Sequence, residues 1–214
     1  MELIQGEAGV MPLGADYVKA ARKLCDEHKA LLIIDEVQTG IGRTGAWFAF
    51  QREDLSGGVT PDIVTFAKGV GGGFPMGGMI SFGAELSALF TPVPTAPLSQ
   101  AIHWALRRHW QRWESSKRTT SWTRRRTRQA AARRYRSCGN PLFVSVRGRG
   151  LLDAIELAHP CSHAAMNWAL EHGLIVNAVA PNALRLAPPL VITAQDVDQA
   201  VSILAKIPSD LPND

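Results

Sequence analysis

Two residues with complementary chemistry, Asp35 and Lys68, each follow a short and largely apolar run. The runs cover residues 30–34 and 62–67, and polar and glycine residues close each of them. Runs of this kind predict strands that are buried on both faces of a parallel sheet. Ligands bind at the carboxyl ends of such strands, so we expect a carboxylate and an amine at one edge of a sheet. This pair suits a cofactor that needs an acid on one side and a covalent lysine on the other.

The glycine-rich setting of Lys68 excludes two common phosphate-binding motifs. The order Ala67-Lys68-Gly69 lacks the Gly-Lys-Ser/Thr of a phosphate-binding loop, and Phe74 stands where the dinucleotide fingerprint requires Gly or Ala. A lysine that forms a Schiff base remains, because a partly desolvated amine beside a cationic group can be neutral and nucleophilic. Asp35 would then keep a pyridinium nitrogen protonated. On spacing alone, a helix cap and a surface lysine remain the alternative.

The overall composition is that of an ordinary globular protein. The chain has 214 residues, of which 46% are hydrophobic and 20% charged, and this allows one large domain or two small ones. No apolar run approaches the roughly eighteen residues of a membrane span, and no segment resembles a signal peptide. Cys25, Cys138 and Cys161 form no CxxC pair, which argues against a secreted disulfide framework. We therefore expect a cytoplasmic protein without a membrane partner.

The excess of basic over acidic residues is confined to one segment. Residues 95–138 hold twelve of the 23 Lys and Arg, one of the 19 acids and four of the six tryptophans. The rest of the chain has eleven basic and eighteen acidic residues, a net charge of −7. Arginine and tryptophan together could contact phosphates and stack on bases, but no helical or strand periodicity presents them. A nucleic-acid-binding module is therefore an alternative, and we expect no nucleic-acid partner.

Regular patterns flank this segment. Residues 14–30 have apolar positions spaced like one face of a helix, and they precede the first predicted strand. This is a helix and strand alternation of α/β type. The later patterns predict strands over 142–157, a helix over 162–172, a strand over 174–179 and a final helix from a capping pair at Thr193 and Asp196 through Leu204. The last third is thus predicted to be a compact α+β unit.

His159, Cys161 and His163 lie close together in the sequence and could be imagined as metal ligands. They belong to a loop that contains proline, and no fourth ligand accompanies them. We therefore predict a solvated loop and no metal site.

Several blocks of the sequence closely resemble the class III pyridoxal-phosphate aminotransferases. One is the run DEVQTGIGRTG at residues 35–45, and others lie at residues 3–10, 60–69, 71–77, 146–151 and 184–190. The resemblance implies the α/β fold of fold type I, with a large domain of mostly parallel sheet and an α+β small domain. It also implies pyridoxal 5'-phosphate as cofactor and a homodimer with shared active sites. We expect residues 1–93 to form part of the large domain and 139–214 the small domain.

The resemblance assigns four residues to the cofactor. Lys68 would be the covalent lysine and, once released by substrate, the proton shuttle. Asp35 would pair with the pyridine nitrogen. Val37 would pack on a ring face, and Gln38 would lie near the phenolic oxygen.

Two further residues would bind the substrate. Arg185 would be a ligand of the substrate carboxylate, which suits the planar fork of a guanidinium, and Glu7 would neutralise it when the substrate is an ω-amino compound. A surface ion pair and a solvated loop acid are the alternatives for these two. The resemblance at residues 71–77 and 176–178 implies amino transfer between N-acetylornithine and 2-oxoglutarate, in arginine biosynthesis. Ornithine or 4-aminobutyrate as amino donor, and a non-catalytic remnant, remain open.

Two departures from the family predict impaired or absent activity. The chain starts close to the family's Glu-Pro-Ile-Gln-Gly-Glu motif, so we expect most of the amino-terminal half, with its phosphate-holding turn, to be absent. The family's His-Gly-Ser/Thr-Thr-Phe-Gly-Gly-Asn-Pro segment is missing from residues 94–138. Residues 94–105 can be encoded so that reading two bases later gives D-S-T-T-F-A-G-N-P. We interpret 94–138 as an irregular or disordered product of a shifted reading frame, which DNA sequencing across codons 90–140 would test.

Overall fold

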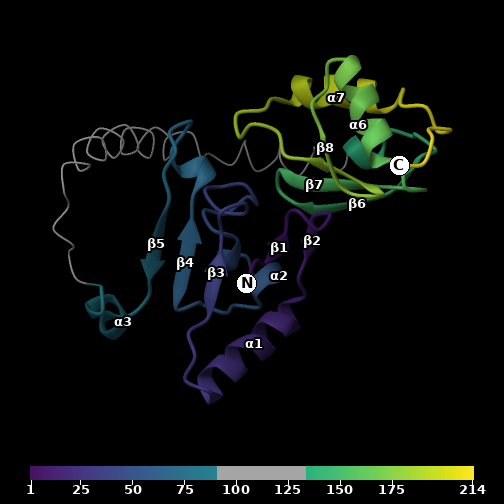
Figure 1. Ribbon diagram of the computed structural model, residues 1–214. Helices are drawn as coiled ribbons and strands as arrows, with labels where there is room; N and C mark the ends of the chain where they lie inside the picture. Colours follow the sequence, from purple (N-terminus) through teal and green to yellow (C-terminus); the bar gives the residue numbers. More distant parts are fainter. Residues whose placement is uncertain (91–133) are drawn as a thin grey trace. The chain divides into compact units, whose positions relative to one another are not determined.

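The computed structural model describes residues 1–90 and 134–214, and these residues form two compact units. The N-terminal unit comprises residues 1–3, 13–41 and 46–90 of the described chain, and the C-terminal unit comprises residues 4–12, 42–45 and 134–214. Each unit has its own sheet (Figure 1). Most of the segment interpreted as frame-shifted lies outside the described residues.

The N-terminal unit contains a three-stranded mixed sheet in the order β3-β4-β5. The strands are β3 (Ile33–Asp35), β4 (Ile63–Phe66) and β5 (Gly78–Ser81). Strand β4 is parallel to β3 and antiparallel to β5. The helices of this unit are α1 (Ala15–Glu27), α2 (Glu53–Ser56) and α3 (Ala84–Ala88), with 3-10 turns η1 (Ala49–Gln51) and η2 (Lys68–Val70). The two apolar runs form the neighbouring strands β3 and β4. Their parallel pairing is that of an α/β sheet, as predicted.

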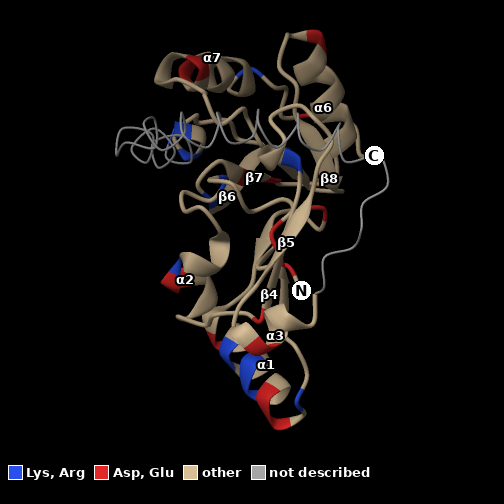
Figure 2. Cartoon of the chain, turned by 90° about the vertical axis from the view of Figure 1, so that its left-hand side faces the viewer, with Lys and Arg blue, Asp and Glu red and all other residues tan. Residues whose placement is uncertain are grey.

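Helix α1 confirms the prediction made for residues 14–30. Val18 is buried, and Figure 2 shows acidic and basic residues along the rest of the helix. Arg22 donates a hydrogen bond of 2.7 Å to the Asp62 carboxylate, which also accepts the backbone N–H of Leu32 at 2.6 Å. Burial alone would raise the pKa of Asp62, but these hydrogen bonds outweigh it and lower the pKa. The helix is thereby tied to Asp62, the residue before β4.

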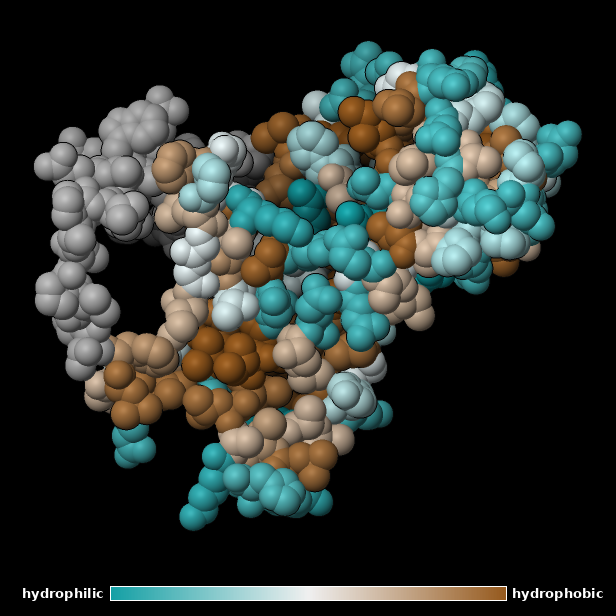
Figure 3. All heavy atoms as spheres, viewed as in Figure 1, coloured by the Kyte–Doolittle hydropathy of each residue, from teal (hydrophilic) through white to brown (hydrophobic). Residues whose placement is uncertain are grey.

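The expectation that both apolar runs are buried on two faces is wrong for the first run. In β4, the central strand, Ile63 and Val64 point to opposite faces and are 6% and 0% exposed. In β3, Ile34 is 1% exposed but Ile33 is 41% exposed. Among the described residues, β3 pairs with β4 along one edge, and Met1 and Glu2 pair with its other edge. Figure 3 shows hydrophobic residues at the surface of this unit.

The C-terminal unit contains a four-stranded antiparallel sheet in the order β6-β7-β9-β8. Its strands are β6 (Phe143–Arg149), β7 (Leu152–Leu157), β8 (Asn177–Ala180) and β9 (Ala183–Leu186), and its helices include α6 (Ser162–Glu171) and α7 (Ala194–Leu204). Both helices lie over the same face of the sheet (Figures 1 and 2). A short hairpin of β1 (Ile4–Gln5) and β2 (Met11–Pro12) belongs to this unit.

The core of the C-terminal unit lies between the sheet and these helices. Ile155 and Leu184 from the sheet and Ala165 and Val197 from the helices are fully buried in one cluster. Tyr135, at the edge of the described residues, joins this cluster and is 3% exposed. The structure confirms the predicted strands, the two helices and the Thr193 capping pair, whereas the strand expected over 174–179 begins later, at Asn177.

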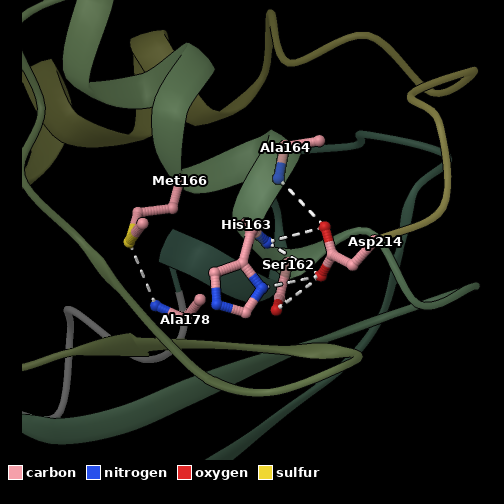
Figure 4. A network of polar contacts seen from close by, with 6 residues as sticks. All are labelled: Ser162, His163, Ala164, Met166, Ala178 and Asp214. Carbon is pink, nitrogen blue, oxygen red and sulfur yellow. Dashed lines mark hydrogen bonds and ion pairs between the residues drawn. The ribbon is translucent and has the colours of Figure 1, made fainter.

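The N-terminus of α6 is capped by a side chain 50 or more residues away in sequence (Figure 4). The Asp214 carboxylate accepts the backbone N–H groups of His163, at 3.0 and 3.1 Å, and of Ala164, at 3.2 Å. It also contacts the Ser162 hydroxyl at 3.2 Å and the His163 ring Nδ1 at 3.1 Å. Burial opposes ionisation, but these bonds outweigh it and lower the pKa of Asp214 to about 2. The last residues thus hold the start of α6.

Replacing Asp214 by alanine is expected to lower the free energy of unfolding by about 1–2 kcal/mol at neutral pH, as for other helix N-caps. The carboxylate has a lower pKa in the folded chain than in the unfolded one, so its contribution is complete above about pH 4 and is lost as the pH falls through about 2. Urea unfolding at several pH values measures the difference, with the exposed Asp210→Ala as control. A difference that stayed constant down to pH 2 would contradict capping by the ionised group.

In the described part of the chain, no helix is both long and apolar enough to cross a membrane.

Candidate active site

Asp35 is the last residue of β3 and is paired in register with Thr65 of β4. Its Oδ1 accepts the backbone N–H of Val37 at 2.9 Å, and its own N–H donates to the Met1 carbonyl at 2.8 Å. Asp35, Val37 and Gln38 are each half-buried. The chain start and the turn after β3 therefore hold this carboxylate at the carboxyl end of the strand.

Lys68 lies three residues beyond Thr65 and begins η2. Its side chain is exposed, and its backbone has φ +47°, in the left-handed region. A residue with a side chain in this region costs about 1–3 kcal/mol, and such strain is concentrated at functional sites. Val10, Lys29 and Ile41 share this backbone conformation, so it does not by itself distinguish Lys68.

The turns that follow β3 and β4 touch each other. A Cβ atom built at Gly69, next to Lys68, would lie 3.5 Å from the Cβ of Ile41. Because the two strands are parallel, both turns leave from the same edge of the sheet. The structure therefore brings Asp35 and Lys68 to one edge, in adjacent turns, as the sequence predicts.

A buried acid that the sequence did not single out lies directly after Asp35. Glu36 is 0% exposed, its Oε1 accepts the backbone N–H of Phe50 at 2.9 Å, and its Oε2 accepts the hydroxyl of Thr39. Burial raises the pKa of Glu36, and the nearby charge of Asp35 acts in the same direction, against the hydrogen bonds. In the sequence, Glu36 is an acid immediately after an apolar strand. That pattern does not by itself reveal that the side chain is buried.

Arg185 and Glu7, both in the C-terminal unit, form an ion pair. Arg185 lies in β9, and its Nη1 donates to Glu7 Oε1 at 2.7 Å and to the Gly6 carbonyl at 3.2 Å. The Arg185 side chain is 14% exposed and that of Glu7 is 68% exposed. The acid is thus the more accessible partner, and a substrate carboxylate competing for the guanidinium would have to displace it. This pair belongs to the C-terminal unit, whereas Asp35 and Lys68 belong to the N-terminal unit.

A second buried acid was also missed. Asp153 lies in β7 and is 2% exposed. A Cβ at Gly148, on the neighbouring strand, would lie 2.8 Å from Asp153 Oδ1 and 2.1 Å from the Leu152 carbonyl, so glycine leaves the room that this carboxyl occupies. Burial raises the pKa of Asp153 to about 7, against the attraction of Arg136, Arg149 and Arg43.

The loop considered as a metal site has a structural use instead. His159 contacts Asn213, and His163 contacts Asp214. Cys161 is buried, which corrects the expectation that all three residues are solvated. Within residues 1–90 and 134–214, no cluster of three His, Cys, Asp or Glu side chains could hold a metal ion.

Comparison with known sequences assigns the chain to a family. The family model described as "Aminotransferase class-III" matches residues 1–103 and 117–207. An acetylornithine aminotransferase from Bifidobacterium longum is 65% identical over all of this chain and half of its own length. One from Corynebacterium efficiens is 40% identical over 99% of this chain and 51% of its own length. The chain spans about half the length of the curated relatives that it matches.

Solved structures agree with the sequence comparisons. The N-acetylornithine aminotransferase of Stenotrophomonas maltophilia is 35% identical, with a TM-score of 0.77 over 95% of this chain and 54% of its own. The ornithine aminotransferase of Plasmodium yoelii is 26% identical, with a TM-score of 0.77 over 97% of this chain. Class III aminotransferases are pyridoxal-phosphate-dependent enzymes of fold type I. By both sequence and fold, this chain belongs to the class III aminotransferase family.

Proposed function

We propose that this chain carries the part of an aminotransferase site that binds the ring of pyridoxal 5'-phosphate and the carboxylate of the substrate. The observation that carries this proposal is the placement of Asp35 and Lys68 in adjacent turns, at the carboxyl edge of two parallel strands. A carboxylate and an amine are the groups that a pyridinium ring with an aldehyde requires. The residues present therefore fit the ring of this cofactor.

The bound cofactor would act as an electron sink for the substrate's reacting carbon. Asp35 would keep the ring nitrogen protonated, and its hydrogen bond from Val37 would hold the carboxylate in place. Lys68 would bind the cofactor covalently through Nζ and, when freed by substrate, would move the proton. Val37 would pack on a ring face, and Gln38 would lie near the phenolic oxygen.

Arg185 would orient the substrate through its carboxylate. Its pairing with Glu7 gives the guanidinium a partner while no substrate is bound, and an amino donor without a carboxylate at that end would leave the pair intact. An amino acceptor with a carboxylate there would open the pair. This exchange would let one site accept two different substrates in turn.

For the reaction, we propose amino transfer between N-acetylornithine and 2-oxoglutarate, in arginine biosynthesis. The names of the relatives from Bifidobacterium longum and Corynebacterium efficiens support this choice over ornithine or 4-aminobutyrate. We also propose a homodimer located in the cytoplasm. Because residues 94–138 do not contain the family's His-Gly-Ser/Thr-Thr segment, we expect low or no turnover.

Cofactor titration followed by a donor assay tests this proposal. The purified chain is titrated with pyridoxal 5'-phosphate and its absorbance spectrum is recorded. It is then supplied with 2-oxoglutarate and, in separate reactions, N-acetylornithine, ornithine or 4-aminobutyrate, and glutamate is measured. We expect an absorbance band from protein-bound cofactor and, where glutamate forms, the fastest rate with N-acetylornithine. If no band appears at saturating cofactor, the ring-binding proposal fails; a faster rate with ornithine would reassign the donor.

A further inference from the structure

The turn that carries Asp35 is built around the buried carboxylate of Glu36. The backbone N–H of Glu36 donates to the Thr65 carbonyl of β4 at 2.8 Å, so the chain is still part of the sheet at this residue. Neighbouring side chains of an extended chain point to opposite faces, which places the Glu36 side chain away from that of Asp35. Asp35 is half-buried and Glu36 is 0% exposed. The two adjacent acids therefore have different surroundings and different tasks.

The Glu36 carboxylate closes the turn on itself. Thr39 donates its hydroxyl to Oε2, and the backbone N–H of Gly40 donates to the Glu36 carbonyl at 2.8 Å. A Cβ at Gly40 would lie 2.8 Å from that same carbonyl oxygen and 3.3 Å from the ring of Phe48, so no larger residue fits. The side chain of Glu36 thus bonds Thr39 and its backbone carbonyl bonds Gly40. Together these two bonds close the turn that contains Val37 and Gln38.

The Glu36 carboxylate also connects the turn after β3 to the end of β4. Oε1 accepts the N–H of Phe50, in η1. The rings of Phe48 and Phe50 have centroids 6.1 Å apart, and Phe48 also lies 6.0 Å from the ring of Phe66. Phe66 is the last residue of β4, two positions before Lys68. A continuous set of contacts therefore runs from Glu36 to the residues that precede the lysine.

We propose that Glu36 is a positioning residue, which holds the Asp35–Gly40 turn in the conformation that presents Asp35, Val37 and Gln38 to the cofactor ring. This inference rests on the proposed function. Its physical basis is that a buried carboxylate with two strong hydrogen bonds is costly to leave unsatisfied. A turn that kept this carboxylate buried without both bonds would leave it unsatisfied, so burial of Glu36 favours the conformation in which both bonds form.

Three variants separate the contributions of the two hydrogen bonds that the Glu36 carboxylate accepts. Glu36→Ala removes both side-chain hydrogen bonds. Glu36→Gln retains them, because an amide can accept the N–H of Phe50 and donate to the Thr39 hydroxyl. Thr39→Val removes one bond and leaves the other. Leu55→Ala, at a residue of α2 that is 1% exposed, is the matched control for a loss of stability elsewhere in the same unit.

Hydrogen exchange is measured first, on the full chain without cofactor. In Glu36→Ala we expect the amides of Val37, Gly40 and Phe50 to exchange about tenfold faster, since their hydrogen bonds depend on the closed turn. Glu36→Gln should exchange like the unaltered chain, and Thr39→Val should lie between the two. Leu55→Ala should leave the turn amides unchanged relative to those of β4. Unchanged exchange in Glu36→Ala would overturn the proposal.

Cofactor binding is measured second, by titration with pyridoxal 5'-phosphate. Glu36→Ala should weaken binding roughly 10- to 100-fold and shift the absorbance band of the bound cofactor, because small misplacements of a polar partner have effects of this size. Glu36→Gln should restore both. The proposal would also be overturned if Glu36→Ala exchanged its turn amides faster but bound the cofactor within twofold of the unaltered affinity and with an unshifted absorbance band. If the unaltered chain binds no cofactor, the proposed function fails, while the exchange measurement still decides whether Glu36 holds the turn.

Discussion

Lys68→Ala is expected to abolish covalent retention of pyridoxal 5'-phosphate and the absorbance band of the bound cofactor. Lys68 lies in the turn after β4, next to the turn that follows Asp35, and alanine offers no nitrogen to replace its Nζ. Where the chain turns over, the rate should fall at least about 10²- to 10⁴-fold, the usual contribution of a positioned acid or base. Borohydride treatment followed by peptide mass spectrometry should find the cofactor mass on the peptide of Lys68.

Lys29→Ala is the matched control for this experiment. Lys29 is also exposed and also has a left-handed backbone, with φ +54°, but it follows α1 and is not in either turn at the carboxyl edge. Neither substitution relieves the backbone strain, because alanine and lysine are similarly disfavoured at positive φ, so stability should change little in both. Labelling of Lys29 instead of Lys68, or an unchanged band in Lys68→Ala, would contradict the assignment of the covalent lysine.

Asp153→Asn is expected to raise the free energy of unfolding at pH 8 by up to roughly 4 kcal/mol, the amount that corresponds to the pKa difference. The pKa of Asp153 is raised by burial from 3.8 to about 7. The folded chain therefore disfavours the ionised form, and stability falls as the pH rises from about 4 to about 7. Asparagine cannot ionise and resembles the protonated acid, so the variant should lack this fall.

Urea unfolding between pH 4 and pH 8 measures the effect. Asp198→Asn is the control, because Asp198 lies in the same unit and forms an ion pair with Arg134 while remaining 59% exposed. Exposed pairs contribute about 0–1 kcal/mol, so this control should show the pH dependence of the unaltered chain. If Asp153→Asn has the same slope as the unaltered chain, the three neighbouring arginines keep Asp153 ionised and the raised pKa is wrong.

Local patterns predicted most secondary structure but not strand burial. The spacing of apolar residues located α1, and the capping pair at Thr193 located α7, because both signals depend on residues within a few positions of each other. The burial of a strand depends on which neighbours it has. Among the described residues, an apolar run is buried in β4, which lies between two strands, and partly exposed in β3, which lies at the side of the three-stranded sheet.

The sequence by itself determined the family and the cofactor, because contiguous blocks such as residues 35–45 and 60–69 resemble the family, and it placed Asp35 and Lys68 at the ends of two apolar runs. Only the tertiary structure revealed that Glu36 and Asp153 are buried, that Asp214 caps α6 and that Arg185 meets Glu7 across 178 residues. Each of these depends on contacts between residues far apart in the chain. No local pattern encodes such contacts, since they arise only when the strands and helices pack together.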